Sequence, residues 1–178
     1  MPSSLDAIMG SVEPSLTQEE KVTKMIQTRR LRVVVFQGPP GSGKSTLAKE
    51  VHNLLTDEDC TIASADHAFE QEDGTFKFKK HLLQEAHTLC QAAALKGIAD
   101  DKVVLIDNTN IKVDHVRPYV DMVVPSKIAV VKINPTNDTQ ARKCAERGIH
   151  APFDYSMRAW KQMETIPRIF TLNLSPQF

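Results

Sequence analysis

The sequence predicts an α/β fold in which a parallel sheet of about five strands is covered by helices on both faces. Short apolar runs alternate with segments of helical periodicity along nearly the whole chain. Residues 31–36, 103–106 and 128–133 are almost continuously apolar, which indicates strands that are buried on both faces. A glycine-rich segment lies between the first of these runs and the helical segment that follows it.

Length and charge restrict the domain organisation and the partners. The 178 residues predict one main domain over residues 30–178, preceded over residues 1–29 by a flexible tail and a short helix. Lys plus Arg and Asp plus Glu each number 22, so the formal net charge is zero. A protein that coats long duplexes usually carries a broad basic excess. Any contact with nucleic acid is therefore expected to be local, for example at one strand end.

The cysteines and the apolar segments indicate in which cellular compartment the protein is expected. Cys60, Cys90 and Cys144 are odd in number and widely spaced, which argues against a disulfide framework and fits a reducing environment. The first residues lack the basic and apolar pattern of a signal peptide, and no segment is long and apolar enough for a membrane span. We therefore expect a soluble cytoplasmic or nuclear protein with no membrane partner.

The elements of the first half follow in order. Thr17 and Glu20 have the spacing of a capping box, which predicts a short helix to about residue 28. The strand at 31–36 comes next, and apolar residues on one side of 44–55 predict a helix. Residues 61–65 predict a second short strand, and Asp73-Gly74 predicts a loop or hairpin over 71–78.

The second half continues the alternation of strands and helices. Residues 80–94 have helical spacing, with Gly97 as the expected stop, and the strand at 103–106 follows. The remaining expected elements are a helix at 114–123, a strand at 128–133, two polar helices at 138–147 and 154–165 that would form a lid, and a last strand or tail at 166–178.

The glycine-rich segment has the pattern G-x-x-x-x-G-K-[ST] of a phosphate-binding P-loop, with a strand before it and a helix after it. This context favours the P-loop over a chance glycine turn, so we expect the chain to bind ATP or another nucleoside triphosphate together with Mg²⁺. Lys44 is expected at the terminal phosphates and the Ser45 hydroxyl on Mg²⁺. The expected nucleotide-binding residues of the loop are Gly38, Pro39, Pro40, Gly41, Ser42, Gly43, Lys44, Ser45 and Thr46.

Two carboxylates follow expected strands and would emerge at the same edge of the sheet as the loop. Asp107 occupies the position of an acidic residue that orders Mg²⁺ or its water, although a strand-end Asp can also cap the next helix. Asp66 can accept a proton from an attacking hydroxyl group, although an N-cap or turn Asp is an equally good reading.

Basic residues in two other segments are candidates for binding. Arg142, Arg147 and Arg158 lie on the expected lid helices, where arginines can close over a nucleotide, and Arg147 is the best placed because Gly148 follows it. Three lysines alternate with aromatic residues at 76–80, a pattern that grips single strands in some proteins and marks an exposed hairpin in others.

Three motifs together resemble the polynucleotide 5′-hydroxyl kinases: the loop 38–46, Ser64-Ala65-Asp66, and Val104-Leu105-Ile106-Asp107-Asn108-Thr109-Asn110. They are also similar to the kinase-like half of the 2′,3′-cyclic nucleotide 3′-phosphodiesterase and of related vertebrate kinase-like proteins. Cys144-Ala145-Glu146-Arg147-Gly148-Ile149-His150-Ala151-Pro152 resembles the lid of that family. The resemblance covers about residues 33–163.

The resemblance implies a P-loop kinase fold and transfer of the γ-phosphoryl group of ATP to the 5′-hydroxyl end of RNA or DNA. It implies Asp66 as the general base, Lys44 and Arg147 as catalytic residues, and Asp107 and Thr109 at the acceptor. Arg142 is a further expected nucleotide contact. Phage-type members place an Arg three residues after the base, where it grips the 3′-phosphate of the acceptor, but here that residue is Phe69. A small-molecule kinase and a non-catalytic nucleotide-binding module that docks a partner therefore stay open as alternatives.

Overall fold

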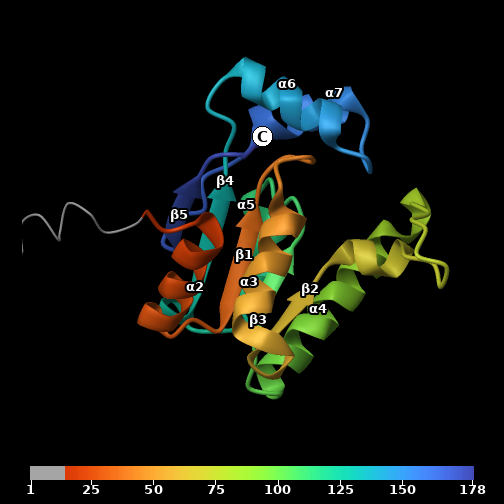
Figure 1. Ribbon diagram of the computed structural model, residues 1–178. Coiled ribbons are helices and arrows are strands. Elements are labelled where there is room, and N and C mark those ends of the chain that lie inside the picture. The colour runs from red at the N-terminus through yellow and green to blue at the C-terminus, as the bar shows by residue number, and fades with distance from the viewer. Residues whose placement is uncertain (1–14) are drawn as a thin grey trace, which may run out of the picture.

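The computed structural model describes residues 15–178 and shows one five-stranded parallel sheet (Figure 1). The strands are β1 (Val33–Gln37), β2 (Cys60–Ala63), β3 (Val103–Asp107), β4 (Ile128–Ile133) and β5 (Phe170–Leu174). Their spatial order is β2-β3-β1-β4-β5, and every neighbouring pair is parallel. The predicted fold class, a P-loop kinase fold with about five parallel strands, is confirmed.

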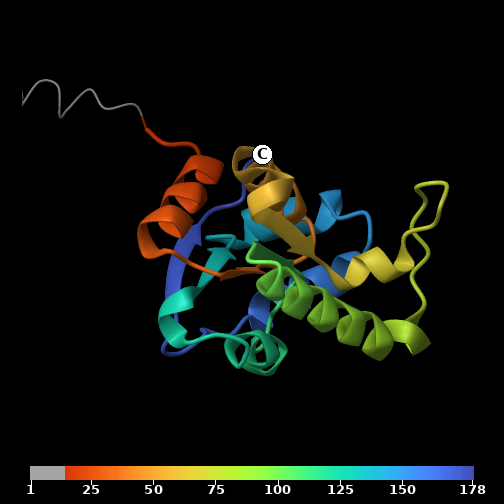
Figure 2. The same cartoon turned by 90° about the horizontal axis from the view of Figure 1, so that it is seen from below.

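Helices cover both faces of the sheet, as the view from below shows (Figure 2). The helices that pack on it are α2 (Gln18–Arg29), α3 (Lys44–Asp59), α4 (Leu83–Ala99) and α5 (Val113–Val120). Val34 and Phe36 of β1 share a core cluster with α2 and α3, whereas Val33 and Val35 share the opposite cluster with α4 and α5. Alternate residues of one strand thus enter different cores, which explains why β1 is apolar at nearly every position.

The prediction that Gly97 ends its helix is wrong, because α4 continues through it to Ala99. A Cβ at this glycine would lie 2.6 Å from Val104 Cγ2 and 2.7 Å from Thr61 Cγ2. Close packing of α4 on two strands, rather than helix termination, therefore explains the glycine. At Thr56 the preceding helix α3 breaks, with a φ of 71°, one residue after its expected end, before the chain continues to Asp59.

The predicted helix over 154–165 is too long, because α7 (Phe153–Gln162) stops before Glu164. The backbone N–H of Glu164 donates to Ile111 O at 2.8 Å, and its carboxylate accepts from the Val113 N–H at 3.1 Å. These bonds to the segment after β3 hold Glu164 outside the helix. Pro118 lies well inside α5 rather than near its first turn.

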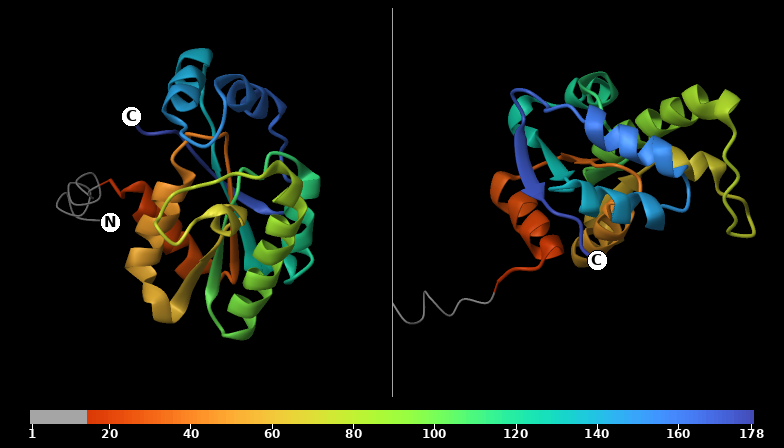
Figure 3. Two further views of the ribbon diagram at one scale, coloured as in Figure 1. Left: turned by 90° about the vertical axis from the view of Figure 1, so that its right-hand side faces the viewer. Right: turned by 90° about the horizontal axis from the view of Figure 1, so that it is seen from above.

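The lid consists of α6 (Asp138–Arg147) and α7, which lie over the carboxyl ends of the strands (Figure 3). It has a small core of its own, in which Ala141, Ala145 and Met157 are buried and Trp160 packs against them. The Trp160 Nε1–H also donates to Pro135 O at 3.1 Å, which ties α7 to the segment that leads from β4.

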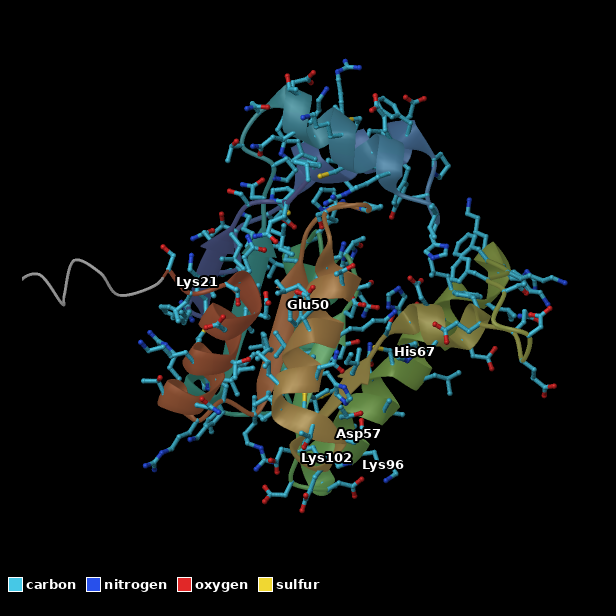
Figure 4. The ribbon with its side chains drawn as sticks, in the orientation of Figure 1. Lys21, Glu50, Asp57, His67, Lys96 and Lys102 are labelled. Atoms are coloured by element: carbon cyan, nitrogen blue, oxygen red, sulfur yellow. The ribbon has the colours of Figure 1, made fainter. Side chains whose placement is uncertain are left out.

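The amino-terminal edge of the sheet is held together by polar contacts far from the lid, around Asp57, Lys96 and Lys102 (Figure 4). The Lys102 ammonium group donates to Asp57 O at 2.7 Å, and Lys96 pairs with Asp100 at 2.6 Å. Because the Lys96–Asp100 ion pair is exposed, it contributes at most about 1 kcal/mol.

The other predictions on organisation have mixed outcomes. The three cysteines are free and buried, so the absence of a disulfide framework is confirmed. The predicted flexible tail falls mostly outside the described residues, and the boundary at residue 30 stays a prediction. Val22 and Ile26 of α2 are buried in the core, so this helix packs as part of the fold. Between residues 15 and 178, no helix has the length and hydropathy needed to cross a membrane.

Candidate active site

The loop between β1 and α3 adopts a conformation that needs its glycines. Gly41 and Gly43 have φ angles of 80° and 98°, which L side chains rarely adopt. Gly43 is the N-cap of α3 and has no side chain to cover the free N–H groups of the first helical turn. These N–H groups and the positive end of the helix dipole suit an anion such as a phosphate group.

Lys44 is folded back over this loop and is only 7% exposed. Its ammonium group donates to Pro39 O at 3.1 Å and lies 3.5 Å from Ser42 Oγ. Burial lowers the pKa of Lys44, while the negative charges of Asp107 and Asp66 raise it. A buried cation held only by neutral oxygens within the described residues is well suited to bind phosphate. Ser45 is exposed on the first turn of α3, and its role as a Mg²⁺ ligand stays a prediction.

Asp66 and Asp107 come together at the carboxyl edge of the sheet. Asp107 ends β3, and Asp66 lies on the 3₁₀ helix η1 (Ala65–Phe69), whose first turn is capped by the Ser64 hydroxyl. Burial raises the pKa of Asp66, and the charge of Asp107 raises it further, against the effects of His150, Lys44 and His67. The two carboxylates and Lys44 therefore share one electrostatic environment beside the loop.

The D-N-T-N block (residues 107–110) holds the segments of the site together by hydrogen bonds. This role was not predicted from the sequence. Asn108 Oδ1 accepts the Ala65 N–H at 2.9 Å, Thr109 O accepts the Gly38 N–H at 3.1 Å, and Asn110 Nδ2 donates to Phe36 O at 2.8 Å. The block thus holds the η1 segment, the loop and β1 in fixed relation. A run of polar residues directly after a buried strand was the signal for this role. The role of Thr109 in binding the acceptor substrate stays a prediction.

Arg147 reaches the loop from the end of α6. Its Nε–H donates to Gly41 O, its Nη1–H donates to Gln177 O, and its guanidinium lies 4.6 Å from the centre of the Phe178 ring. A Cβ on Gly41 would lie only 1.8 Å from Cys144 O, so the lid rests directly on the loop. Arg142 instead makes its contacts within the lid, where it pairs with Asp138 at 2.6 Å. Its assignment to the nucleotide stays a prediction.

Aromatic side chains form the wall beside Asp66. Phe69 is buried at 2% exposure and packs against Phe76 and Phe78, with ring centres 6.0 Å and 5.2 Å away. The residue in place of the expected Arg therefore anchors the hairpin that projects beside the site (Figure 2). Phe76 also contacts His150 of the lid, with ring centres 4.1 Å apart. The hairpin and the lid thus meet on the side of Asp66, a contact for which the sequence offered no signal.

Comparison with known proteins agrees with this geometry. Residues 33–166 match a family of AAA domains, AAA_33. The chain belongs to this AAA domain family. The match begins at the first residue of β1 and extends past the end of α7, so the AAA domain includes the loop, both carboxylates and the lid.

Two kinds of relative add to the family match. Human NEDD4-binding protein 2 is 32% identical over 143 residues, which is 75% of this chain but 8% of that protein's length. The gluconokinase of Sinorhizobium meliloti 1021 has the same fold, with a TM-score of 0.54 and 14% identity over 82% of this chain and 83% of that one. Kti12 of Chaetomium thermophilum, solved with ADP-AlF3, gives a TM-score of 0.52 and 15% identity over 79% and 88%. The solved structures show that the fold is kinase-like. The AAA domain match together with the glycine loop implies nucleotide binding.

Proposed function

We propose that this chain is an ATP- and Mg²⁺-dependent kinase that transfers the γ-phosphoryl group to the 5′-hydroxyl end of RNA or DNA. The observation that carries the proposal is the grouping of Lys44, Asp66 and Asp107 beside the glycine loop. One cation for phosphate, one carboxylate for a metal ion and one for a proton are the groups that phosphoryl transfer to an alcohol needs.

Asp66 is suited to be the proton acceptor in this reaction. Its raised pKa, caused first by burial and then by Asp107, makes the carboxylate a stronger base than an exposed aspartate. The 5′-hydroxyl oxygen forms a bond to the γ-phosphorus as its proton passes to Asp66. The bond from the γ-phosphorus to the bridging oxygen breaks, and ADP leaves with that electron pair.

The other residues hold the phosphates and offset their charge. The loop N–H groups and Lys44 would bind the outer phosphates, and Arg147, which already contacts the loop, would reach them from the lid. Ser45 and Asp107 would hold Mg²⁺, since hydroxyl and carboxylate oxygens are ligands that this ion prefers. When bound, Mg²⁺ neutralises negative charge on the transferring group.

Two observations support a nucleic-acid acceptor. The motifs of the chain resemble those of polynucleotide 5′-hydroxyl kinases, and the hairpin beside Asp66 carries Lys77, Lys79 and Lys80 together with Phe78, whose side chain is 52% exposed. Exposed aromatic rings and lysines suit the bases and phosphates of a single strand. The formal net charge of zero favours a second candidate, a kinase that acts on a small alcohol.

The decisive experiment uses γ-labelled ATP, Mg²⁺ and 5′-hydroxyl oligonucleotides of RNA and DNA. We expect transfer by the wild type and a loss of about 10²- to 10⁴-fold in Asp66→Asn. Asp121→Asn, which changes an exposed carboxylate at the end of α5, is the matched control and should retain activity. Label on a small alcohol but on no oligonucleotide would support the second candidate instead. Nucleotide binding without any turnover would refute both kinase proposals.

A further inference from the structure

A groove lies between the start of α5 and the lid helix α7. Its volume is about 330 Å³. One wall is formed by Ile111, Lys112 and His115, and the opposite wall by Tyr155, Arg158 and Gln162. The groove therefore runs between the segment that follows the D-N-T-N block and the second lid helix.

Two cations in this groove have no anionic partner among residues 15–178. Lys112 and Arg158 are exposed and form none of the ion pairs found in that part of the chain. Of the carboxylates nearby, Asp114 pairs with Arg117 at 2.9 Å and Glu164 accepts the Val113 N–H. The described residues that line the groove include two cations and no carboxylate, although the formal net charge of the chain is zero.

The groove also offers an aromatic surface. Tyr155 is 47% exposed, and its ring lies in the same wall as Arg158. A half-exposed ring beside a guanidinium group suits a ligand that carries both a flat base and an anionic group. A sugar or a small alcohol lacks both features.

The groove begins next to the D-N-T-N block that ends β3. Ile111 follows directly on the block whose Asn108 side chain holds the backbone next to Asp66. Burial lowers the pKa of His87 on α4, the charge of His115 lowers it further, and the charge of Asp66 raises it. His87 is thus near enough to both the proposed base and the groove residue His115 to sense their charges.

We infer that this groove binds a backbone phosphate and the adjacent base of the acceptor strand near its 5′ end. The inference rests on the proposed function. Lys112 and Arg158 provide the two positive charges for the phosphate, and Tyr155 provides the ring on which the base stacks. Phe69 is buried in the aromatic wall and has no charge to offer a phosphate, so Lys112 and Arg158 would add to the lysines of the hairpin as cations for the strand.

A binding measurement tests the groove without turnover. The fluorescence anisotropy of a 3′-labelled, 5′-hydroxyl single strand of about ten nucleotides is measured without ATP. We expect Lys112→Ala/Arg158→Ala to raise Kd at least about 10-fold and, because one phosphate loses its contacts, to reduce the slope of log Kd against log salt by about 0.7. Arg117→Ala/Lys161→Ala removes the same charge from exposed positions on the same two helices outside the groove, and should change Kd less than about threefold.

Kinetics then separate this inference from the proposed function. If the oligonucleotide is phosphorylated, the groove variant should raise its KM at least about 10-fold and leave the KM for ATP unchanged. Equal effects of the groove and control variants on Kd and KM would overturn the inference alone. Strand binding that depends on Lys112 and Arg158, without phosphoryl transfer, would overturn the kinase proposal and leave the groove as a strand-binding site. If the wild type does not bind the strand, the inference that the groove binds nucleic acid is wrong.

Discussion

The contact between the lid and the glycine loop can be broken by one methyl group. Gly41→Ala would place its Cβ 1.8 Å from Cys144 O, in a backbone conformation with a φ of 80°. Since Cβ atoms essentially never approach other heavy atoms within 3.0 Å, the two backbones must separate by at least about 1.2 Å. Both are main-chain segments, so rotation of a side chain cannot relieve the clash. The lid must lift from the loop.

The size of the effect follows from two contributions. The positive φ costs an alanine about 1–2 kcal/mol, offset by about 0.4–1 kcal/mol from the smaller entropy of the unfolded chain. Gly74 has almost the same φ, 82°, and nothing within 4 Å of its added Cβ, so Gly74→Ala measures this part alone. Overpacking adds about 1–3 kcal/mol for Gly41→Ala. A difference of about 2 kcal/mol would shift the lid about 30-fold towards its open state.

Urea unfolding of the two variants and titration with a fluorescent ATP analogue test this reasoning. We expect Gly41→Ala to be less stable than Gly74→Ala by about 1–3 kcal/mol and to bind the analogue at least about 10-fold more weakly. Gly74→Ala should bind the analogue like the wild type. If the two variants lose equal stability and bind the analogue equally, the lid does not rest on the loop as described.

Three further predictions concern the site and its walls. Asp107→Asn removes the charge that raises the pKa of Asp66, so the acid limb of the kcat/KM profile for phosphoryl transfer should move to lower pH, and an unmoved limb would contradict the coupling. Phe69→Ala should lower the free energy of unfolding by about 3–5 kcal/mol, and Phe78→Ala by much less, because Phe69 is 2% and Phe78 52% exposed. Asn110→Ala should cost about 2–4 kcal/mol in urea unfolding, because a strand carbonyl loses its donor and the φ of 49° favours Asn; Asn110→Gly, which keeps the φ, should cost less.

The pH dependence of stability gives a second check on Asp66. Its pKa is raised in the folded protein, so the folded state holds this proton to higher pH than the unfolded state. The stability associated with the protonated carboxyl is present below the unfolded pKa, about 3.9, and is lost as pH rises through the folded pKa. Asp66→Asn should therefore be more stable than the wild type at neutral pH in urea unfolding, and this difference should vanish at low pH.

The sheet and the polar residues that follow its strands could be predicted from the sequence, because both depend on local patterns. Continuous apolar runs specify buried parallel strands, and residues that follow such strands must emerge at one edge. This rule places Asp66 and Asp107 at the same edge of the sheet from the sequence alone. The glycine pattern specified the loop for a similar reason, because Gly41 and Gly43 need positive φ angles.

Other features depend on contacts between distant segments and leave little mark on the local pattern. Gly97 looks like a helix stop, yet it serves the approach of α4 to two strands. Glu164 fits a helical pattern, yet its hydrogen bonds to the segment after β3 end α7 early. The contact of His150 with Phe76 joins a lid to a hairpin more than 70 residues away, and its ring could not be distinguished from other exposed histidines.

The separate core of the lid has a practical consequence for the study of motion in this chain. Trp160, the single tryptophan among the 178 residues, packs in that core and bonds to the segment from β4. Tryptophan emission, excited where tyrosine does not absorb, is thus an unlabelled optical probe of the lid. Stopped-flow mixing with ATP would then follow closure of the lid in real time. A blue shift of the emission would indicate that the Trp160 ring loses contact with water, and a red shift that it gains contact with water.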